Sequence, residues 1–272
     1  MMLRNPREGA WGVPPENIFQ VVDERSGDVL CSCVISSEEK PVLYPGRPHQ
    51  VRLAFDGGKE HLDALIGAAL ARAREMCRER NLPARIYARC APDDEVLLAH
   101  LTSYGFKDND GIVRMRADLP AQTFARPPAG CVVVRDALED AQERKYFLER
   151  YNELFTADYD QQWLRNYAEA DGFTRILTVA ATGMAGEVVV WRNGDFGEIG
   201  FLQTARRWRR MGVAKYMLAL ALDELARMGL SAARADIRVK IPHLLHALEK
   251  SAFYQETLIT RYPGIDVSDV AS

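Results

Sequence analysis

Apolar and polar positions follow two distinct periods in the first 119 residues of the chain. Short alternating or apolar segments, bounded by turn residues such as Gly27, predict strands at residues 18–23, 29–36, 50–55, 84–90 and 111–119. From residue 59 to residue 80, apolar residues instead recur every three or four positions. This spacing predicts a long helix with one buried face, and a shorter helix is expected at 94–104.

The same two periods continue in the second half of the chain. They predict strands at residues 131–134, 173–181, 186–192, 197–204, 233–239 and 254–259, and helices at 140–154, 160–170, 212–229 and 243–251. Gly229 is typical of a helix C-terminus. Strands that alternate with helices indicate an α/β protein with mixed sheets. A right-handed crossover would make the strands at 197–204 and 233–239 parallel neighbours.

Both halves have one order of elements in common: hairpin, strand, long helix, strand, short helix, strand. The second half has a further strand and two helices in front, where the first half has only the 17 residues that precede Ile18. Proline and glycine punctuate the segment between the halves, at Pro120, Pro127, Pro128 and Gly130. We therefore expect two domains, at residues 1–119 and 131–272, that repeat one pattern and are joined by a linker at 120–130.

The composition narrows the class of protein. The 272 residues are 47% hydrophobic and 27% charged with a net charge of -3, which is typical of a globular protein and argues against one that coats nucleic acid. No run of apolar residues is long enough for a membrane-spanning helix, and residues 1–11 do not resemble a signal peptide. The cysteines lack zinc-like spacing; they are Cys31, Cys33, Cys77, Cys90 and Cys131. We expect buried thiols, no metal and a reducing cytoplasm.

One segment of the second half has the pattern of an anion site. A predicted strand at 197–204 runs into a basic turn at 206–210, and the turn opens the long helix. The N-terminus of a helix presents unpaired N–H groups and a partial positive charge, which together favour phosphate. Gly212 has no side chain to block the approach, and Arg209 and Arg210 add positive charge. The alternative is a solvated basic turn in front of an ordinary helix.

The residues of this turn resemble a known motif. The run Arg209-Arg210-Met211-Gly212-Val213-Ala214 is similar to the Arg/Gln-x-x-Gly-x-Gly/Ala motif of the GNAT N-acetyltransferases. The resemblance covers about residues 130–262 and, more faintly, residues 18–119, where Tyr104-Gly105-Phe106 is similar to the end of another segment of the family. It implies a tandem protein of two GNAT-like domains, each with a mixed, mostly antiparallel, twisted sheet and flanking helices. The first domain would be shortened.

The same resemblance implies the cofactor-binding residues. Acetyl-CoA would be the co-substrate, and backbone N–H groups at the start of the helix would hold its pyrophosphate. The residues concerned are Arg209, Arg210, Met211, Gly212, Val213, Ala214 and Lys215. The pantetheine arm would run along the strand at Leu202, Gln203 and Thr204, pairing with its backbone. Leu202 is equally expected as a core residue.

Glu198 is the candidate general base. The family's histone-acetylating members carry a carboxylate near this distance from the motif, and Glu198 lies 11 residues before Arg209. An alkylamine with a pKa near 10.4 is almost wholly protonated at neutral pH, and only the neutral amine attacks a thioester. A carboxylate can accept the proton, directly or through water. The alternative is a surface carboxylate at the start of a strand.

The usual acid of the family is missing. The family's Leu-Tyr-Glu-Lys-x-Gly-Phe segment corresponds to residues 247–253, where Leu248 replaces the tyrosine, and Ile241 replaces a frequent asparagine. Tyr254 is the candidate substitute, against the alternative of a packed tyrosine at the start of a strand. His243 and His246 are expected as a partly exposed pair on one helix face.

The equivalent turn in the first domain, residues 54–60, carries Asp56 and Glu60, which would repel a pyrophosphate. We expect this domain not to bind CoA; it would either frame the acceptor pocket or shield a sheet edge. A basic cluster around Trp208 also suits nucleic acid, but the acidic chain disfavours this reading. The polar segment at 158–162 would either favour a cationic amine or cap a helix.

These observations predict an N-acetyltransferase that moves an acetyl group directly from acetyl-CoA to a primary amine of a small molecule or peptide. No residue is expected to carry the acyl group, although Cys131 lies in the same domain. No metal, nucleic acid or membrane partner is expected, and the protein would be a monomer or a homodimer. One alternative is a non-catalytic acyl-CoA sensor or interaction protein. The other is an acyltransferase that uses a longer acyl chain or a hydroxyl acceptor.

Overall fold

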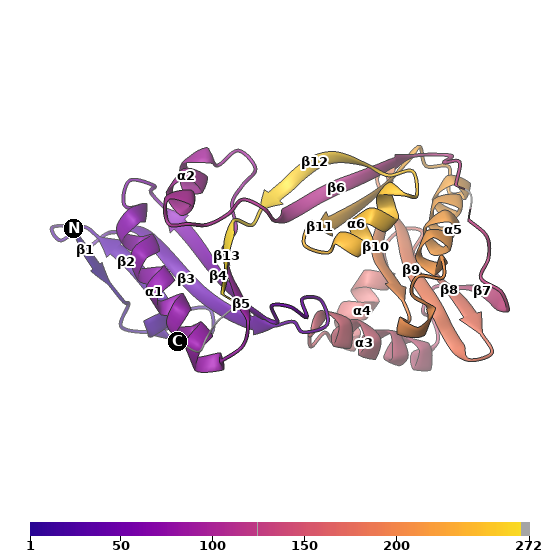
Figure 1. Ribbon diagram of the computed structural model, residues 1–272, viewed down its shortest axis with the longest axis horizontal. Coiled ribbons are helices and arrows are strands. Elements are labelled where there is room, and N and C mark those ends of the chain that lie inside the picture. The colour runs from indigo at the N-terminus through magenta and orange to yellow at the C-terminus, as the bar shows by residue number, and fades with distance from the viewer. Residues whose placement is uncertain (124, 268–272) are drawn as a thin grey trace. The chain divides into compact units, whose positions relative to one another are not determined.

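The computed structural model describes residues 1–123 and 125–267, which form two compact units (Figure 1). Of the described residues, unit 1 comprises Met1–Ile112, Leu154–Thr156 and residues 259–267. Unit 2 comprises Val113–Glu153 and Ala157–Leu258. Both are α/β with mixed, mostly antiparallel sheets, as the sequence predicts. Among the described residues, no helix has the length and apolarity that crossing a membrane requires.

Unit 1 is built on a six-stranded sheet in the order β1-β2-β3-β4-β5-β13. The strands are β1 (Met2–Arg4), β2 (Ile18–Val22), β3 (Val29–Glu39), β4 (His49–Gly57), β5 (Ala84–Ala88) and β13 (Gly264–Val267). A 3-10 helix at Pro15–Asn17 precedes β2, and the helices are α1 (Leu62–Arg80) and α2 (Glu95–Ser103). The pair β4–β5 is parallel, and α1 forms the crossover between them.

The core of unit 1 lies between the sheet and α1. The apolar stripe of α1 is buried, including Leu65, Ile66 and Ala69, because these positions recur at helical spacing. Asn81 ends the helix in the left-handed conformation at φ 50°. Four of the five cysteines are buried, as predicted, whereas Cys131 is only half-buried.

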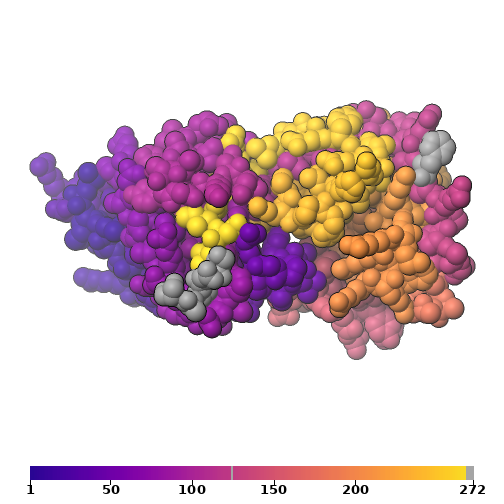
Figure 2. All heavy atoms as spheres, in the orientation of Figure 1, coloured from indigo at the N-terminus to yellow at the C-terminus, as the bar shows by residue number. Residues whose placement is uncertain are grey.

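The strand β13 joins the sheet of unit 1 from the far end of the sequence. It pairs antiparallel with β5, and Figure 2 shows its yellow residues among the violet ones of unit 1. The buried Arg85 holds it, donating to Asp266 at 2.7 Å and to the carbonyl of Tyr262 at 3.2 Å. A Cβ at Gly264 would lie 2.8 Å from the Arg85 guanidinium carbon, so this close approach requires glycine.

Unit 2 is built on a seven-stranded sheet in the order β12-β6-β11-β10-β9-β8-β7 (Figure 1). The strands are β6 (Gly111–Asp118), β7 (Cys131–Asp136), β8 (Thr174–Ala180), β9 (Gly183–Asn193), β10 (Phe196–Thr204), β11 (Ala232–Arg238) and β12 (Tyr254–Arg261). The helices are α3 (Ala141–Phe155), α4 (Gln161–Ala168), α5 (Val213–Arg227) and α6 (Pro242–Glu249), and a 3-10 helix spans Arg206–Trp208.

Helices cover both faces of this sheet. A Cβ at Gly186 on β9 would meet Val213 and Met217 of α5. The next residue, Glu187, points to the opposite face, where Arg150 of α3 donates to it at 2.9 Å. The α5 face contains the apolar core, with Met217 and Leu218 fully buried.

The predicted elements agree with the structure to within a few residues, but two short strands, β1 and β13, were not predicted. The domain boundary also differs in position from the expected linker at 120–130. The strand β6 was expected to close the first domain, yet it lies in the sheet of unit 2 between β12 and β11. Hydrophobic periodicity identifies a strand and not its partner, so the exchange of β6 and β13 between the sheets leaves no periodic signal.

Candidate functional site

The parallel strands β10 and β11 separate soon after they meet. Their register consists of Gly197 with Ala233 and Glu198 with Arg234. Beyond these pairs β10 continues to Thr204 and β11 to Arg238, and no further pairing joins them among the residues that the structure describes. The other edge of β10 stays paired with β9 as far as Thr204. The edge of β10 from Ile199 onward therefore presents backbone groups that no neighbouring strand uses.

A β-bulge lies where the separation begins. The register between β10 and β9 shifts between Ile199 and Phe201, which leaves Gly200 as the extra residue. A Cβ at Gly200 would lie 2.0 Å from the ring of Trp191 and 2.5 Å from the hydroxyl of Tyr167. Only glycine fits this position, and bulges of this kind are common next to active sites.

The open edge of β10 leads to the N-terminus of α5. Arg210 and Gly212 have positive φ angles of 64° and 79°, which turn the chain into the helix at Val213. No side chain caps the helix, so its first N–H groups stay available, and the helix dipole adds a partial positive charge. A Cβ at Gly212 would meet no atom of the described residues within 4 Å, so these residues leave the space in front of the helix open. These features fit an anion such as a phosphate.

Basic side chains surround this helix terminus. Arg209, Arg210 and Lys215 are exposed, and His243 at the start of α6 lies near enough for the charge of Arg209 to affect it. Partial burial and that charge lower the pKa of His243. Arg207 is instead engaged within the protein, because its guanidinium donates a hydrogen bond to the carbonyl of Thr182.

The other predicted cofactor-binding residues lie on the same two segments. Leu202, Gln203 and Thr204 are half-buried on the open stretch of β10, and Leu202 also packs against the core of unit 2. Met211 is exposed, Val213 is buried against Gly186, and Ala214 is half-buried. The side chain of Val213 therefore belongs to the core, and only its backbone N–H is available to a ligand.

Glu198 forms, with Arg234, the last residue pair between β10 and β11 before the two strands separate. It therefore lies where the open edge of β10 begins. It is half-buried opposite Trp191 on β9, and Asn193 donates to it at 3.3 Å. Burial raises the pKa of the Glu198 carboxyl, and the nearby Asp236 carboxylate raises it further, against the effects of Asn193, Arg114 and Arg234. A raised pKa makes the ionised carboxylate a stronger proton acceptor.

The structure does not bring Tyr254 to the other predicted residues. It is exposed on β12, which β6 and β11 separate from β10, and its hydroxyl lies 3.3 Å from Asp118. Leu248, at the position of the family's tyrosine, is buried in the core of unit 2. Glu198 thus lies on β10 and the basic N-terminus of α5 follows that strand, whereas Tyr254 lies on β12 at the edge of the sheet.

A group of aromatic rings beside Glu198 escaped the sequence analysis. Trp163 and Tyr167 of α4 stack with ring centroids 5.1 Å apart, and Tyr167 meets Trp191 edge to face at 5.3 Å. Tyr151 of α3 lies 4.9 Å from Trp163 and 5.3 Å from Phe201 on β10. The four-residue spacing of Trp163 and Tyr167 was the available signal, since it places these two rings on one face of the helix.

The corresponding region of unit 1 differs in two ways. The parallel pair β4–β5 keeps its register over five residues, from His49 with Ala84 to Leu53 with Ala88, where β5 ends. Two exposed acidic residues lie in front of α1: Asp56 near the end of β4 and Glu60 in the turn that follows it. Unit 1 therefore combines strands paired to the end of β5 with an acidic helix terminus.

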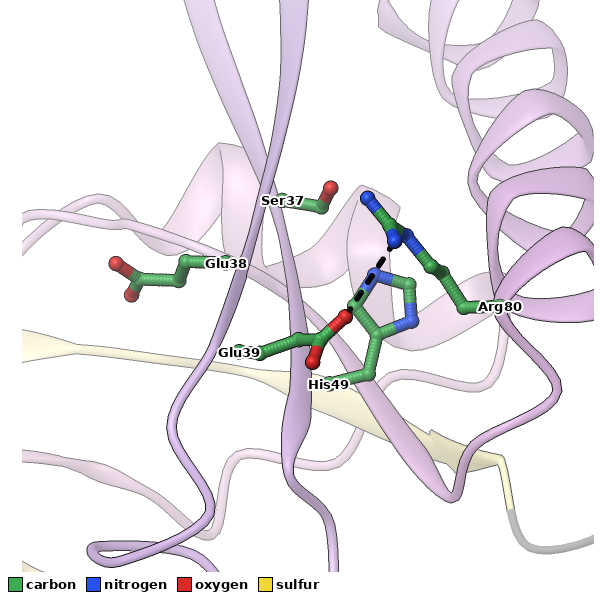
Figure 3. Close-up of a pocket in the computed structure, with 5 residues that line it drawn as sticks. All are labelled: Ser37, Glu38, Glu39, His49 and Arg80. Atoms are coloured by element: carbon green, nitrogen blue, oxygen red, sulfur yellow. Dashed lines mark ion pairs between the residues drawn. The ribbon is translucent and has the colours of Figure 1, made fainter. Parts of the chain in front are cut away.

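Unit 1 has a hollow of its own at the other end of β4. It has a volume of about 220 Å³ and is lined by Ser37, Glu38, Glu39, His49 and Arg80 (Figure 3). The ion pair between Arg80 and Glu39, at 3.7 Å, lies beside the buried His49 ring, and Glu38 points away from it. Among the described residues, neither nitrogen of that ring has a hydrogen-bond partner. Burial lowers the pKa of His49, against the nearby Glu39 carboxylate, which raises it.

Comparison with known proteins identifies the fold. No protein-family model and no curated protein sequence matches the chain. A GCN5-related N-acetyltransferase from Sphaerobacter thermophilus matches 96% of this chain and 86% of its own, with a TM-score of 0.54 and 12% identity. A probable N-acyltransferase of Enterococcus faecalis V583 matches 92% of this chain and 62% of its own, with a TM-score of 0.54 and 11% identity.

A third solved structure is a glucosamine N-acetyltransferase region of a fungal multi-domain β-N-acetylglucosaminidase. It matches 91% of this chain and 33% of its own, with a TM-score of 0.51 and 13% identity. The chain thus has the fold of the GNAT N-acetyltransferases, and the resemblance seen in the sequence is confirmed at the level of fold. At these identities the likeness concerns architecture, so the chemistry rests on the residues of this chain.

Proposed function

We propose that unit 2 is an N-acetyltransferase that binds acetyl-CoA and transfers its acetyl group to a primary amine. This proposal rests on one observation, which is that two features of unit 2 adjoin each other. The open edge of β10 from Ile199 to Thr204 leads directly to the uncapped, basic N-terminus of α5. An extended ligand with an anionic end and an amide-containing arm complements both features at once.

Acetyl-CoA has these properties. Its pyrophosphate fits the N–H groups of residues 211–215, with Arg209, Arg210 and Lys215 supplying positive charge. Its pantetheine arm fits the edge of β10 as an added strand, since the arm carries amide donors and acceptors. The open stretch from Thr204 back to Ile199 spans about 17 Å at the rise of a β-strand. The thioester would then lie near Gly200 and Glu198.

The transfer is direct in this proposal. Glu198, or a water that it holds, takes a proton from the ammonium group of the acceptor. The neutral nitrogen then attacks the thioester carbon, the new C–N bond forms, and the C–S bond breaks to release the CoA thiolate, which takes up the second proton that the nitrogen loses. A thiol with a pKa near 8.5 is a fair leaving group, so the reaction proceeds without the tyrosine that Leu248 replaces. Positioning of the two substrates supplies most of the acceleration.

The acceptor is a primary amine of a small molecule or peptide. Glu198, with its raised pKa, is suited to take a proton from the ammonium form of such an acceptor. One solved structure of the same fold is described as a glucosamine N-acetyltransferase region, which is consistent with an amino group as the acceptor. Unit 1 takes no part in binding CoA, because its acidic turn and fully paired β5 oppose it.

A non-catalytic acyl-CoA binding protein is the second candidate. The burial of Leu248 in the core and the position of Tyr254 on β12 favour it, because neither residue supplies an acid to the thiolate. Turnover separates the two functions: release of CoA thiol in the presence of a panel of primary amines supports the enzyme. Binding of acetyl-CoA without turnover on any amine supports the binding protein.

Calorimetric titration of acetyl-CoA tests the proposed site. Gly212→Glu places a carboxylate in front of α5, and a like charge at about 4 Å costs several kcal/mol, so affinity falls by more than about 10²-fold. Gly229→Glu is the matched control, because Gly229 has a φ of 77°, open surroundings and a place at the other end of the same helix. Equal affinity in both variants, or no binding to the wild type, contradicts the proposal.

A further inference from the structure

Tyr167 carries a buried hydroxyl that the fold does not use. Its ring is fixed on three sides by Trp163, Trp191 and Phe173, with centroids 5.1, 5.3 and 5.7 Å away. The hydroxyl is buried and has no hydrogen-bond partner among the described residues. A phenylalanine would pack in the same way without leaving a polar atom unpaired, so the hydroxyl has no structural explanation.

The position of this hydroxyl is specific. It lies 2.5 Å from the point that a Cβ of Gly200 would occupy. Gly200 is the bulge residue of β10, it is exposed, and it lies where β10 and β11 separate. The hydroxyl of Tyr167 thus lies next to Gly200, where the open edge of β10 begins. Gly200 is two residues from Glu198.

We propose that the Tyr167 hydroxyl donates a hydrogen bond to the acyl oxygen of a thioester bound along β10. This hydrogen bond becomes stronger as negative charge develops on the oxygen. This inference rests on the proposed function of unit 2. When the amine nitrogen attacks the carbonyl carbon, the C–N bond forms and the electron pair of the C=O π bond moves to the oxygen. When that pair returns, the C–S bond breaks and the thiolate leaves. Tyr167 keeps its proton throughout; Glu198 receives the first proton of the ammonium group, and the departing thiolate receives the second.

The surroundings of Tyr167 suit a donor that stays protonated. Burial raises its pKa far above the ordinary value for tyrosine, and the neighbouring Tyr151 raises it further. A donor held rigidly by three rings needs no reorganisation when the oxygen becomes charged, which is the condition for stabilising an oxyanion. This role differs from that of an acid for the thiolate, which neither the buried Leu248 nor Tyr254 on β12 supplies.

A comparison of CoA with acetyl-CoA tests this role without an acceptor. In calorimetric titrations, Tyr167→Phe weakens acetyl-CoA about fivefold, the worth of one hydrogen bond, and leaves the affinity for CoA unchanged. Tyr146→Phe, at an exposed tyrosine of α3, changes neither affinity. The thermal unfolding midpoint of Tyr167→Phe is equal to or above that of the wild type, because the lost hydroxyl had no partner.

The outcomes separate this inference from the proposed function. An equal affinity of Tyr167→Phe and wild type for acetyl-CoA, or an equal loss for CoA and acetyl-CoA, overturns the role of Tyr167 and leaves the site intact. No binding of either compound to the wild type overturns both. With an amine that is turned over, kcat of Tyr167→Phe falls by about 10²-fold. The rise of the rate with pH that Glu198 causes remains in this variant, and its loss would contradict the division of roles.

Discussion

Single residues decide the chemistry of this molecule through their surroundings more than through their identity. Glu198 and Asp236 are both carboxylates of the unit 2 sheet, yet Asp236 accepts two hydrogen bonds from Arg114 at 2.8 Å, whereas Asn193, at 3.3 Å, is the only described residue that donates to Glu198. The Asp236 carboxylate is therefore part of a structural ion pair with Arg114. The half-buried one, with its raised pKa, is free to take a proton.

Glu198→Gln tests this assignment. The amide has the same shape and cannot accept the proton, so kcat falls by about 10²–10⁴-fold while the affinity for acetyl-CoA is retained. In the wild type, kcat/KM rises with pH through the raised pKa of Glu198, because only the ionised form acts as a base. This limb disappears in the variant. Glu249→Gln, at an exposed glutamate next to the end of α6, is the control and leaves the profile unchanged.

His49 makes the stability of unit 1 depend on pH. Its native pKa lies below the ordinary 6.5 of the unfolded chain, because burial disfavours the charged ring. The unfolded chain therefore binds the proton first as the pH falls, and the free energy of unfolding decreases below about pH 6.5. Urea unfolding at about pH 7.5 and about pH 5.5 measures this decrease, which is smaller in His49→Phe. His246→Gln, at an exposed histidine, keeps the wild-type dependence, and an unchanged slope in His49→Phe would contradict the account.

At the scale of elements, the sequence predicts the helices and most strands well because each has its own periodic pattern. The start of α5 is a good example: the basic turn, Gly212 and the apolar stripe from Val213 are all local signals. The separation of β10 from β11 is different, because it depends on pairing between strands that are far apart in sequence. The bulge at Gly200 and the position of Tyr167 depend on such contacts too. The cofactor segment was therefore predictable, and the arrangement around the acyl group was not.

The strand β13 depends on one buried arginine. Asp266→Asn removes the carboxylate that Arg85 and Arg47 contact at 2.7 and 2.9 Å, and leaves the buried Arg85 guanidinium with Asp110, at 3.7 Å, as its carboxylate partner. We expect a loss of about 1–3 kcal/mol in the free energy of unfolding, measured by urea denaturation. Glu79→Gln breaks an ion pair of the exposed Glu79 with Arg72 and changes stability by about 0.5 kcal/mol or less. Equal effects in the two variants would show that Arg85 does not hold the strand.

At the scale of the whole molecule, each sheet contains a strand from the opposite side of the expected linker. The strand β6 precedes residues 120–130 and belongs to unit 2, and β13 follows unit 2 in sequence and belongs to unit 1. The proline-rich segment was a clear local signal, and it marks a loop within unit 2. A sequence pattern identifies loops, whereas the limits of a compact unit depend on which strands pair.

This exchange predicts how fragments of the chain behave. A fragment of residues 131–272 lacks β6, so β11 and β12 lose the strand between them, and we expect it not to fold. A fragment of residues 109–272 keeps all seven strands of the unit 2 sheet and is expected to fold and to bind acetyl-CoA. Circular dichroism and calorimetry compare the two. If both fragments fold equally well, the boundary between the two units lies at residues 120–130 and the account is wrong.

The most direct measurement is hydrogen exchange of the whole chain with and without acetyl-CoA, read by mass spectrometry of peptides. If the ligand lies along β10 and against α5, exchange slows in peptides covering residues 199–204 and 211–215, because bound carbonyl and phosphate oxygens engage amide groups that are open in the free protein. The turn of unit 1 at residues 54–62 keeps its rate. Slowed exchange in that turn, or unchanged exchange along β10 under saturating acetyl-CoA, would contradict the account.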